Sequence, residues 1–141
     1  MNAQIIKDLI SSSRDVESQK WLESLNMIFF TMMIGGSITK ENINDFLSLG
    51  VDLSDSFSWC CSLHDEKKIA LMLPYVNFPT INDIVDGFDC EDSEQSIKSC
   101  LMVVIDFGFP LRIKKSIFES KIGSFKDPEL IGILNSCKFM N

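Results

Sequence analysis

A cysteine pair and the single histidine of the chain form the arrangement closest to a reactive site. His64 lies four residues after Cys60, so on a helix the two side chains would share one face. An imidazole beside a thiol can take its proton and create a thiolate nucleophile, but the ring then needs a third group to orient it. Asp65 is adjacent to His64 in sequence and would point away from that face. We therefore expect a helix-end histidine beside buried cysteines, and no catalytic residue.

Other short motifs for metals and cofactors are incomplete. A zinc site at Cys60, Cys61 and His64 would lack the second pair of ligands that tetrahedral zinc requires. The triplet Asp106-Phe107-Gly108 matches the metal-binding triplet of protein kinases, but the glycine-rich loop and catalytic-loop motif of that fold are missing. No phosphate-binding loop or dinucleotide fingerprint occurs. We expect the triplet to be a helix end, and we expect no metal and no cofactor.

The most distinctive charged feature is the segment NDIVDGFDCEDSEQ, residues 82–95. It contains no base and six acids, which are Asp83, Asp86, Asp89, Glu91, Asp92 and Glu94. Calcium loops place carboxylates at alternate positions before a fixed glycine, and here the alternation fails and Gly87 comes too early. Two interpretations remain. The segment is either a solvated connection or an anionic patch that complements a basic protein partner.

Composition narrows the class of protein. The 141 residues fit one domain, and 20 acids against 13 bases give a net charge of −7. A negative field repels phosphate backbones, so we expect no direct nucleic-acid binding. The longest apolar run, residues 27–36, is shorter than the ~20 residues of a membrane span, and the first residues lack the pattern of a signal peptide. The five cysteines show no disulfide spacing. We expect a cytoplasmic protein with reduced thiols and no membrane contact.

Helical periodicity dominates the chain and predicts an all-α fold. Apolar residues recur at three- and four-residue steps, as from Trp21 to Met32, and Thr39, Asp65 and Asp127 are suited to cap the helices that follow them. The segments IGGSITKENI and IGSFKDPELI match without a gap at an offset of 88 residues. We predict a helical-hairpin repeat array of about four units, residues 17–52, 53–78, 79–110 and 111–138. Residues 75–78 are expected to be extended, Ile113 is assigned to a helix, and no strand is predicted.

Two helix ends, LSLGVDL and IDFGFPL, carry a resemblance to a known family. Each is an apolar helical end, a glycine, one further residue and an extended run, and this resembles the closing phrase of the ankyrin repeat. Asp52 stands at the family's aspartate position, whereas Pro110 replaces it in the second copy. The "threonine, proline, leucine, histidine" start of the family's first helix is missing. A generic array of α-hairpins and an irregular helical bundle are therefore the alternatives.

The ankyrin resemblance implies function by shape. Stacked hairpins would leave a concave surface, lined by first helices and fingertips, with which the family binds other proteins. The fingertip candidates are Asp52, Ser54, Asp55, Asn77, Phe78, Phe109 and Arg112, and for each the alternative is that it folds back into the core.

We interpret the chain as a non-catalytic protein-binding module that inhibits or sequesters a partner protein, of the immunity or anti-defence type. The partner is expected to have a basic surface. Two alternatives remain open. One is an acidic nucleic-acid mimic that blocks a DNA- or RNA-binding enzyme, and the other is a cysteine-dependent enzyme that uses Cys60 or Cys61 with His64.

Overall fold

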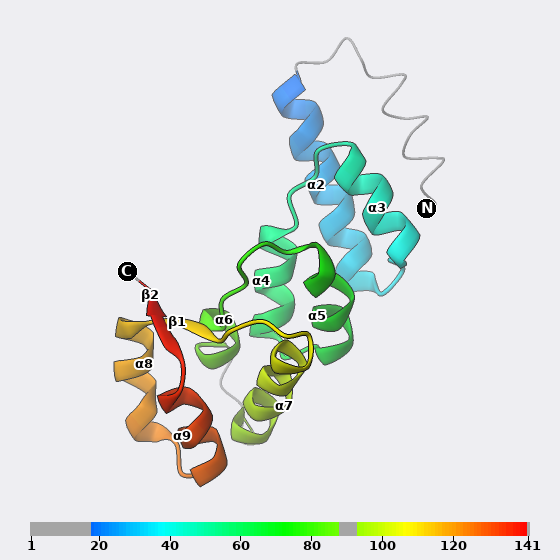
Figure 1. Cartoon of the computed structure of the whole chain (residues 1–141). Coiled ribbons are helices and arrows are strands. Elements are labelled where there is room, and N and C mark those ends of the chain that lie inside the picture. Colours follow the sequence, from blue (N-terminus) through cyan, green and yellow to red (C-terminus); the bar gives the residue numbers. More distant parts are fainter. Residues whose placement is uncertain (1–17, 88–92, 141) are drawn as a thin grey trace. The chain divides into compact units, whose positions relative to one another are not determined.

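The computed structural model of the protein describes residues 18–87 and 93–140. These residues are mostly helical, which confirms the predicted helical character (Figure 1). Contacts divide the chain into two compact units, Met1–Ser56 and Phe57–Asn141. The elements in order are α2 (Ser18–Gly35), α3 (Lys40–Ser48), α4 (Ser54–Ser62), α5 (Glu66–Met72), the 3-10 turn η1 (Leu73–Tyr75), α6 (Asn82–Val85), α7 (Ser93–Asp106), β1 (Arg112–Lys114), α8 (Lys115–Lys121), the 3-10 turn η2 (Ile122–Ser124), α9 (Pro128–Asn135) and β2 (Lys138–Met140).

The first unit contains an antiparallel hairpin of α2 and α3 (Figure 1). The rings of Phe29 and Phe46 meet edge to face, with centroids 5.1 Å apart, and both side chains are fully buried. Thr39 begins α3 with a reciprocal cap. Its hydroxyl accepts the Asn42 backbone N–H at 3.3 Å, and the Asn42 side chain accepts the Thr39 N–H at 3.2 Å. The predicted cap at Thr39 is thus confirmed.

The second unit has α7 at its centre, where it packs against α5, α6 and α9. Its core is formed by fully buried aliphatic side chains such as Ile69, Met72, Ile84 and Leu101. The predicted caps of α5 and α9 are confirmed, because Asp65 accepts the Lys68 N–H and Asp127 accepts the N–H groups of Glu129 and Leu130. Apolar burial and satisfied helix ends therefore hold this unit together.

Among the described residues, the helices α2, α3, α4 and α7 end in the same backbone motif. After α3, the Gly50 N–H donates to Leu47 O and the Val51 N–H donates to Phe46 O, which are the two hydrogen bonds of a Schellman cap. In this motif the residue that directly precedes the second donor must take a left-handed conformation. Here that residue is Gly50, which has φ 94°. The residues in this position are Gly36, Gly50, His64 and Gly108. The cap at Gly108 confirms that Asp106-Phe107-Gly108 is a helix end.

A short parallel sheet corrects the prediction for the last quarter of the chain. Ile113 lies in β1 and not in a helix, and it pairs with Phe139 of β2. A three-residue strand is too short to show alternating burial, so periodicity could not reveal it. The extended stretch expected at residues 75–78 is confirmed at Val76, which has φ −97° and ψ 129°, but not at Tyr75 and Phe78. Tyr75 ends η1, and Phe78 has a left-handed φ of 52°.

Gly87 packs against backbone oxygens of two other segments. A Cβ built at this position would lie 2.7 Å from Ser62 O, 2.9 Å from Asp83 O and 3.2 Å from His64 Nε2. Two of these three atoms belong to the backbone and cannot rotate away, so only glycine fits without a shift of the chain. Gly132, in α9, is the opposite case because a Cβ there would meet nothing within 4 Å.

These two glycines give a paired stability prediction. Gly87→Ala should lower the free energy of unfolding by about 1–3 kcal/mol through steric overlap. Gly132→Ala should raise the free energy of unfolding by about 0.5–1 kcal/mol, because alanine costs less backbone entropy in a helix. Urea unfolding of both variants measures the difference. A Gly87→Ala protein as stable as the parent would contradict the close packing described here.

Candidate functional site

The predicted site residues fall into separate groups. Asp52 and Asp55 lie in the first unit, and Phe78, Phe109 and Arg112 lie together in the second. Of the acidic segment, the structure describes Asp83, Asp86 and Glu94. Asp89, Glu91 and Asp92 lie outside the described residues.

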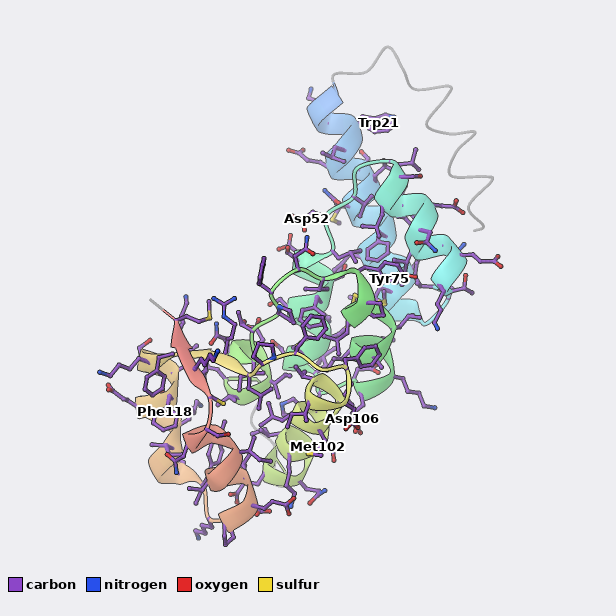
Figure 2. All side chains as sticks on the ribbon, in the orientation of Figure 1. Trp21, Asp52, Tyr75, Met102, Asp106 and Phe118 are labelled. Carbon is purple, nitrogen blue, oxygen red and sulfur yellow. The ribbon has the colours of Figure 1, made fainter. Side chains whose placement is uncertain are left out.

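The acidic groove of the first unit has a volume of about 590 Å³. It is lined by Glu23, Asn26, Met27, Phe30, Asp52, Asp55 and Ser56. Glu23, Met27 and Phe30 recur at four- and three-residue steps on one side of α2. Asp52 lies in the connection from α3 to α4 (Figure 2), and Asp55 lies in the first turn of α4. The lining thus combines three carboxylates with the apolar side chains of Phe30 and Met27, and Met27 is 65% exposed.

Asp52 is fixed by hydrogen bonds that also set its charge. Its Oδ1 accepts the Ser54 hydroxyl at 2.7 Å and the Ser54 backbone N–H at 2.9 Å, and its own N–H donates to Asn26 Oδ1 at 3.1 Å. The hydroxyl bond and then the backbone bond lower the pKa of the Asp52 carboxyl, against a smaller opposing effect of burial. Asp52 is therefore a charged and positioned wall of the groove.

Glu23 and Asp55 differ from Asp52 in that no side-chain hydrogen bond or ion pair holds their carboxylates among the described residues. Within the part of the chain that the structure describes, neither carboxylate forms an ion pair with a lysine or arginine. Of these groove residues, Asp55 is a candidate from the sequence, whereas Glu23 and Met27 are not. The available signal was their spacing on α2, beside the buried stripe. A polar position next to such a stripe is common, so the spacing alone could not single them out.

The aromatic groove of the second unit has a volume of about 380 Å³. It is formed by two segments that lie far apart in sequence, and its lining is Pro74, Val76, Asn77, Phe78, Pro79, Phe109, Pro110 and Arg112. Phe78 is 79% exposed, and the Arg112 guanidinium lies over its ring, 5.9 Å from the centroid. Phe109 is half-buried and directly follows the Gly108 cap. The predicted fingertip residues Asn77, Phe78, Phe109 and Arg112 thus line the same groove.

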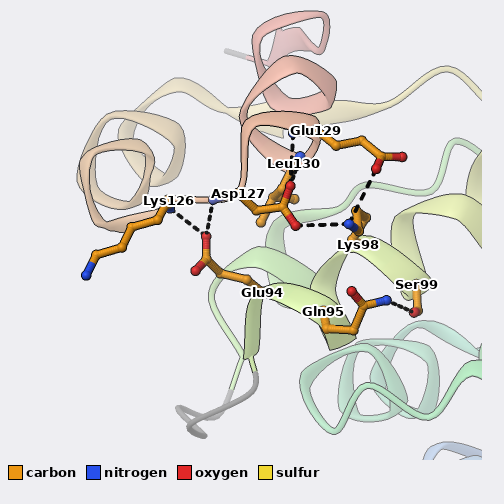
Figure 3. Close-up of polar contacts among 8 residues, drawn as sticks. All are labelled: Glu94, Gln95, Lys98, Ser99, Lys126, Asp127, Glu129 and Leu130. Carbon is orange, nitrogen blue, oxygen red and sulfur yellow. Dashed lines mark hydrogen bonds and ion pairs between the residues drawn. The ribbon is translucent and has the colours of Figure 1, made fainter.

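The described acids of residues 82–95 take partners inside the second unit. Asp83 accepts the Ser58 hydroxyl at 2.7 Å, and Asp86 pairs with Lys121 at 3.3 Å. Glu94 Oε1 accepts the backbone N–H groups of Lys126 and Asp127 at 2.6 and 3.0 Å (Figure 3). These three carboxylates therefore serve the fold, and their position in an acidic run does not by itself make them an interface.

Figure 3 also shows how the same region fixes the start of α9. Lys98 of α7 donates to Asp127 at 2.9 Å and to Glu129 at 3.4 Å. The hydrogen bond from Lys98 is the largest cause that lowers the pKa of the Asp127 carboxyl, and the bond to Asp127 raises the pKa of Lys98. The N-cap of α9 is thus charged and joined to α7.

The cysteine candidates Cys60 and Cys61 are buried, and His64 is half-buried. His64 Nε2 lies 2.8 Å from Ile84 O, so this nitrogen must donate its proton to the carbonyl and cannot accept one from a thiol. Burial raises the pKa of the Cys60 thiol to about 11 and that of Cys100 to about 12, and it also raises the pKa of Cys61. A catalytic thiolate requires the opposite shift. No group of three or more metal-ligand side chains gathers within residues 18–87 and 93–140.

Comparisons with protein-family models, characterised proteins and solved structures gave no match to this chain. In the described segments, no helix is both long enough and apolar enough to cross a bilayer. The proposed function therefore rests on the geometry and charge of the described residues.

Thiol labelling tests the assignment of these cysteines. In a Cys90→Ser variant, Cys60, Cys61, Cys100 and Cys137 should react with a chromogenic disulfide on the order of a hundredfold more slowly than free glutathione at neutral pH. Burial and the raised pKa both reduce the accessible thiolate. Full reactivity should return in denaturant. A rapidly reacting native thiol at Cys60 or Cys61 would contradict this assignment and revive the catalytic alternative.

The raised pKa values of the buried thiols also predict a loss of stability at alkaline pH. Thiols in the unfolded chain begin to ionise near the ordinary pKa of 9.0, whereas folded Cys60 keeps its proton to about 11 and folded Cys100 to about 12. Above pH 9.0 the unfolded state therefore binds fewer protons than the folded state. The stability that depends on these protonated thiols is fully present below pH 9.0 and is lost as the pH rises towards the pKa values of the folded protein. Near pH 10 the free energy of unfolding should fall by about 1 kcal/mol for each such thiol.

Urea unfolding at neutral pH and near pH 10 measures this loss. A Cys60→Ala/Cys100→Ala variant is the control for lysine and tyrosine titration, and it should lose less stability between the two pH values than the parent. Equal losses in both proteins would show that these thiols do not carry the effect.

Proposed function

We propose that this chain is a non-catalytic binding module that captures a partner protein with a basic surface through the acidic groove of its first unit. One observation carries the proposal. Glu23 and Asp55 line a groove that also includes the 65% exposed side chain of Met27, and no cation of the described chain neutralises them. Carboxylates beside exposed apolar side chains suit a lysine or arginine, because these residues have a charged end and an apolar stem.

The expected contact follows from the shape of these cationic side chains. The alkyl stem of a lysine or arginine would cover Met27 and Phe30, and its charged end would lie between the carboxylates of Glu23, Asp52 and Asp55. Asp52 stays charged because its hydrogen bonds to Ser54 lower its pKa. The net charge of −7 adds a long-range attraction for a basic partner, which raises the association rate at low salt.

A binding module of this kind acts by covering a surface of its partner. Inhibition or sequestration, as in immunity or anti-defence proteins, requires no chemistry of its own. The raised thiol pKa values support a non-catalytic role, because a catalytic thiolate requires a lowered pKa.

We also infer the helical-hairpin array that the ankyrin resemblance implies. Two observations support this inference. The predicted unit boundary at residue 52/53 lies close to the boundary between the compact units at Ser56 and Phe57. In addition, α2, α3, α4 and α7 end in the same left-handed cap.

Charge-matched variants test the function. In the groove variant, Glu23→Gln is combined with Asp55→Asn, whereas Asp52 is left intact because it caps α4. In the control variant, Asp106→Asn is combined with Glu119→Gln, which removes two exposed acids of the second unit. The immobilised proteins are then compared for retention of partners from a lysate of the source cells.

We expect the groove variant to retain the specific partner roughly tenfold less than the parent, and we expect the control variant to match the parent. Retention by the parent should fall as salt is added, and the retained protein should have a basic surface. Equal retention by the groove and control variants would reject the acidic groove as the binding site. An acidic partner would reject the proposed complementarity.

A further inference from the structure

Phe78 occupies a position that is unfavourable for a phenylalanine in two respects. Its φ of 52° lies in the left-handed region, where a side chain with a Cβ is strained and where glycine or asparagine is preferred. The side chain is also 79% exposed, so little burial offsets that strain. Local folding alone would favour another residue here. Such departures from local preference are typical of functional positions.

The surroundings of Phe78 form a preorganised surface. Pro74, Pro79 and Pro110 line the groove with Phe109, and their rings restrict the backbone on both sides of it. The segments that contribute them, residues 74–79 and 109–112, lie side by side in the second unit (Figure 1). Rigid walls lose little conformational entropy when a ligand binds. An apolar side chain can therefore enter the groove without a large entropic cost on the side of this protein.

Arg112 supplies the charge of this groove. Its backbone is fixed, because Arg112 O accepts the Ile81 N–H at 2.9 Å and β1 pairs with β2 at this residue. Its guanidinium lies over the Phe78 ring and forms no ion pair with a carboxylate among the described residues. A guanidinium offers parallel N–H donors that match the two oxygens of a carboxylate.

We propose that the aromatic groove binds an extended segment of a second protein in which an apolar side chain lies next to an aspartate or glutamate. The apolar side chain packs against Phe109 and the proline rings, and the carboxylate accepts hydrogen bonds from Arg112. This ligand has the opposite charge to the partner of the acidic groove. The two proposals therefore stand independently, and either can fail without the other.

Selection from a library of short random peptides displayed on phage tests this assignment. The intact chain should enrich peptides with an aliphatic or aromatic residue beside an acid. Arg112→Gln should weaken binding of the selected peptides roughly tenfold or more. Arg112→Glu should reverse the preference and enrich a lysine or arginine at the same place, which a merely structural role of Arg112 would not produce.

Phe78→Asn separates binding from folding. Asparagine tolerates the left-handed conformation, so this variant should keep or raise the melting temperature of the protein while it binds the selected peptides roughly tenfold more weakly. Glu23→Gln with Asp55→Asn should leave peptide binding unchanged, because both acids lie in the other unit. Failure to enrich any peptide family, enrichment without acids, or binding that is insensitive to Arg112→Gln would overturn the proposal.

Discussion

Both grooves depend on one backbone constraint, the left-handed residue that ends a helix and turns the chain away from the helix axis. In a Schellman cap the last carbonyls of the helix bond to the two N–H groups that come next, so the chain must leave the helix axis at once. Gly50 does this after α3, and Asp52 follows two residues later in the wall of the acidic groove. Gly108 does the same after α7, and Phe109 enters the aromatic groove directly. The positions of these side chains are therefore set by backbone hydrogen bonds.

His64 shows that the constraint does not depend on glycine alone. It takes the same left-handed position after α4, with φ 55°, and its ring bonds to Ile84 O. Gly87 packs closely against this turn. Any larger side chain at position 87 would meet Ser62 O and Asp83 O. The single histidine is thus part of a close contact between α4 and the end of α6.

Sequence patterns predicted the helices and their caps better than the sheet. Caps at Thr39, Asp65 and Asp127 combine a side-chain oxygen with an apolar stripe, and both signals are local. The pairing of Ile113 with Phe139 joins residues far apart in the chain through strands of three residues each, and no local pattern records it.

The candidate sites follow the same division between local and non-local information. Phe78, Phe109 and Arg112 could be predicted because each lies near a helix end or a proline. Glu23 and Met27 could not, since they become candidates only because Asp52 and Asp55, from another part of the chain, line the same groove. An acidic run in sequence also does not distinguish acids that serve the fold, such as Asp83 and Glu94, from acids that are left unpaired.

Site-specific photocrosslinking tests the central claim most directly, namely that the acidic groove holds a basic partner. A benzophenone side chain in place of the exposed Met27 would crosslink to whatever protein contacts this groove. The same group in place of the exposed Ser120 on α8 would measure non-specific crosslinking. We predict that the Met27 probe attaches to one protein, at a segment rich in lysine and arginine, and that the Ser120 probe does not. Attachment to the same proteins at both positions, or to acidic segments at Met27, would contradict the account.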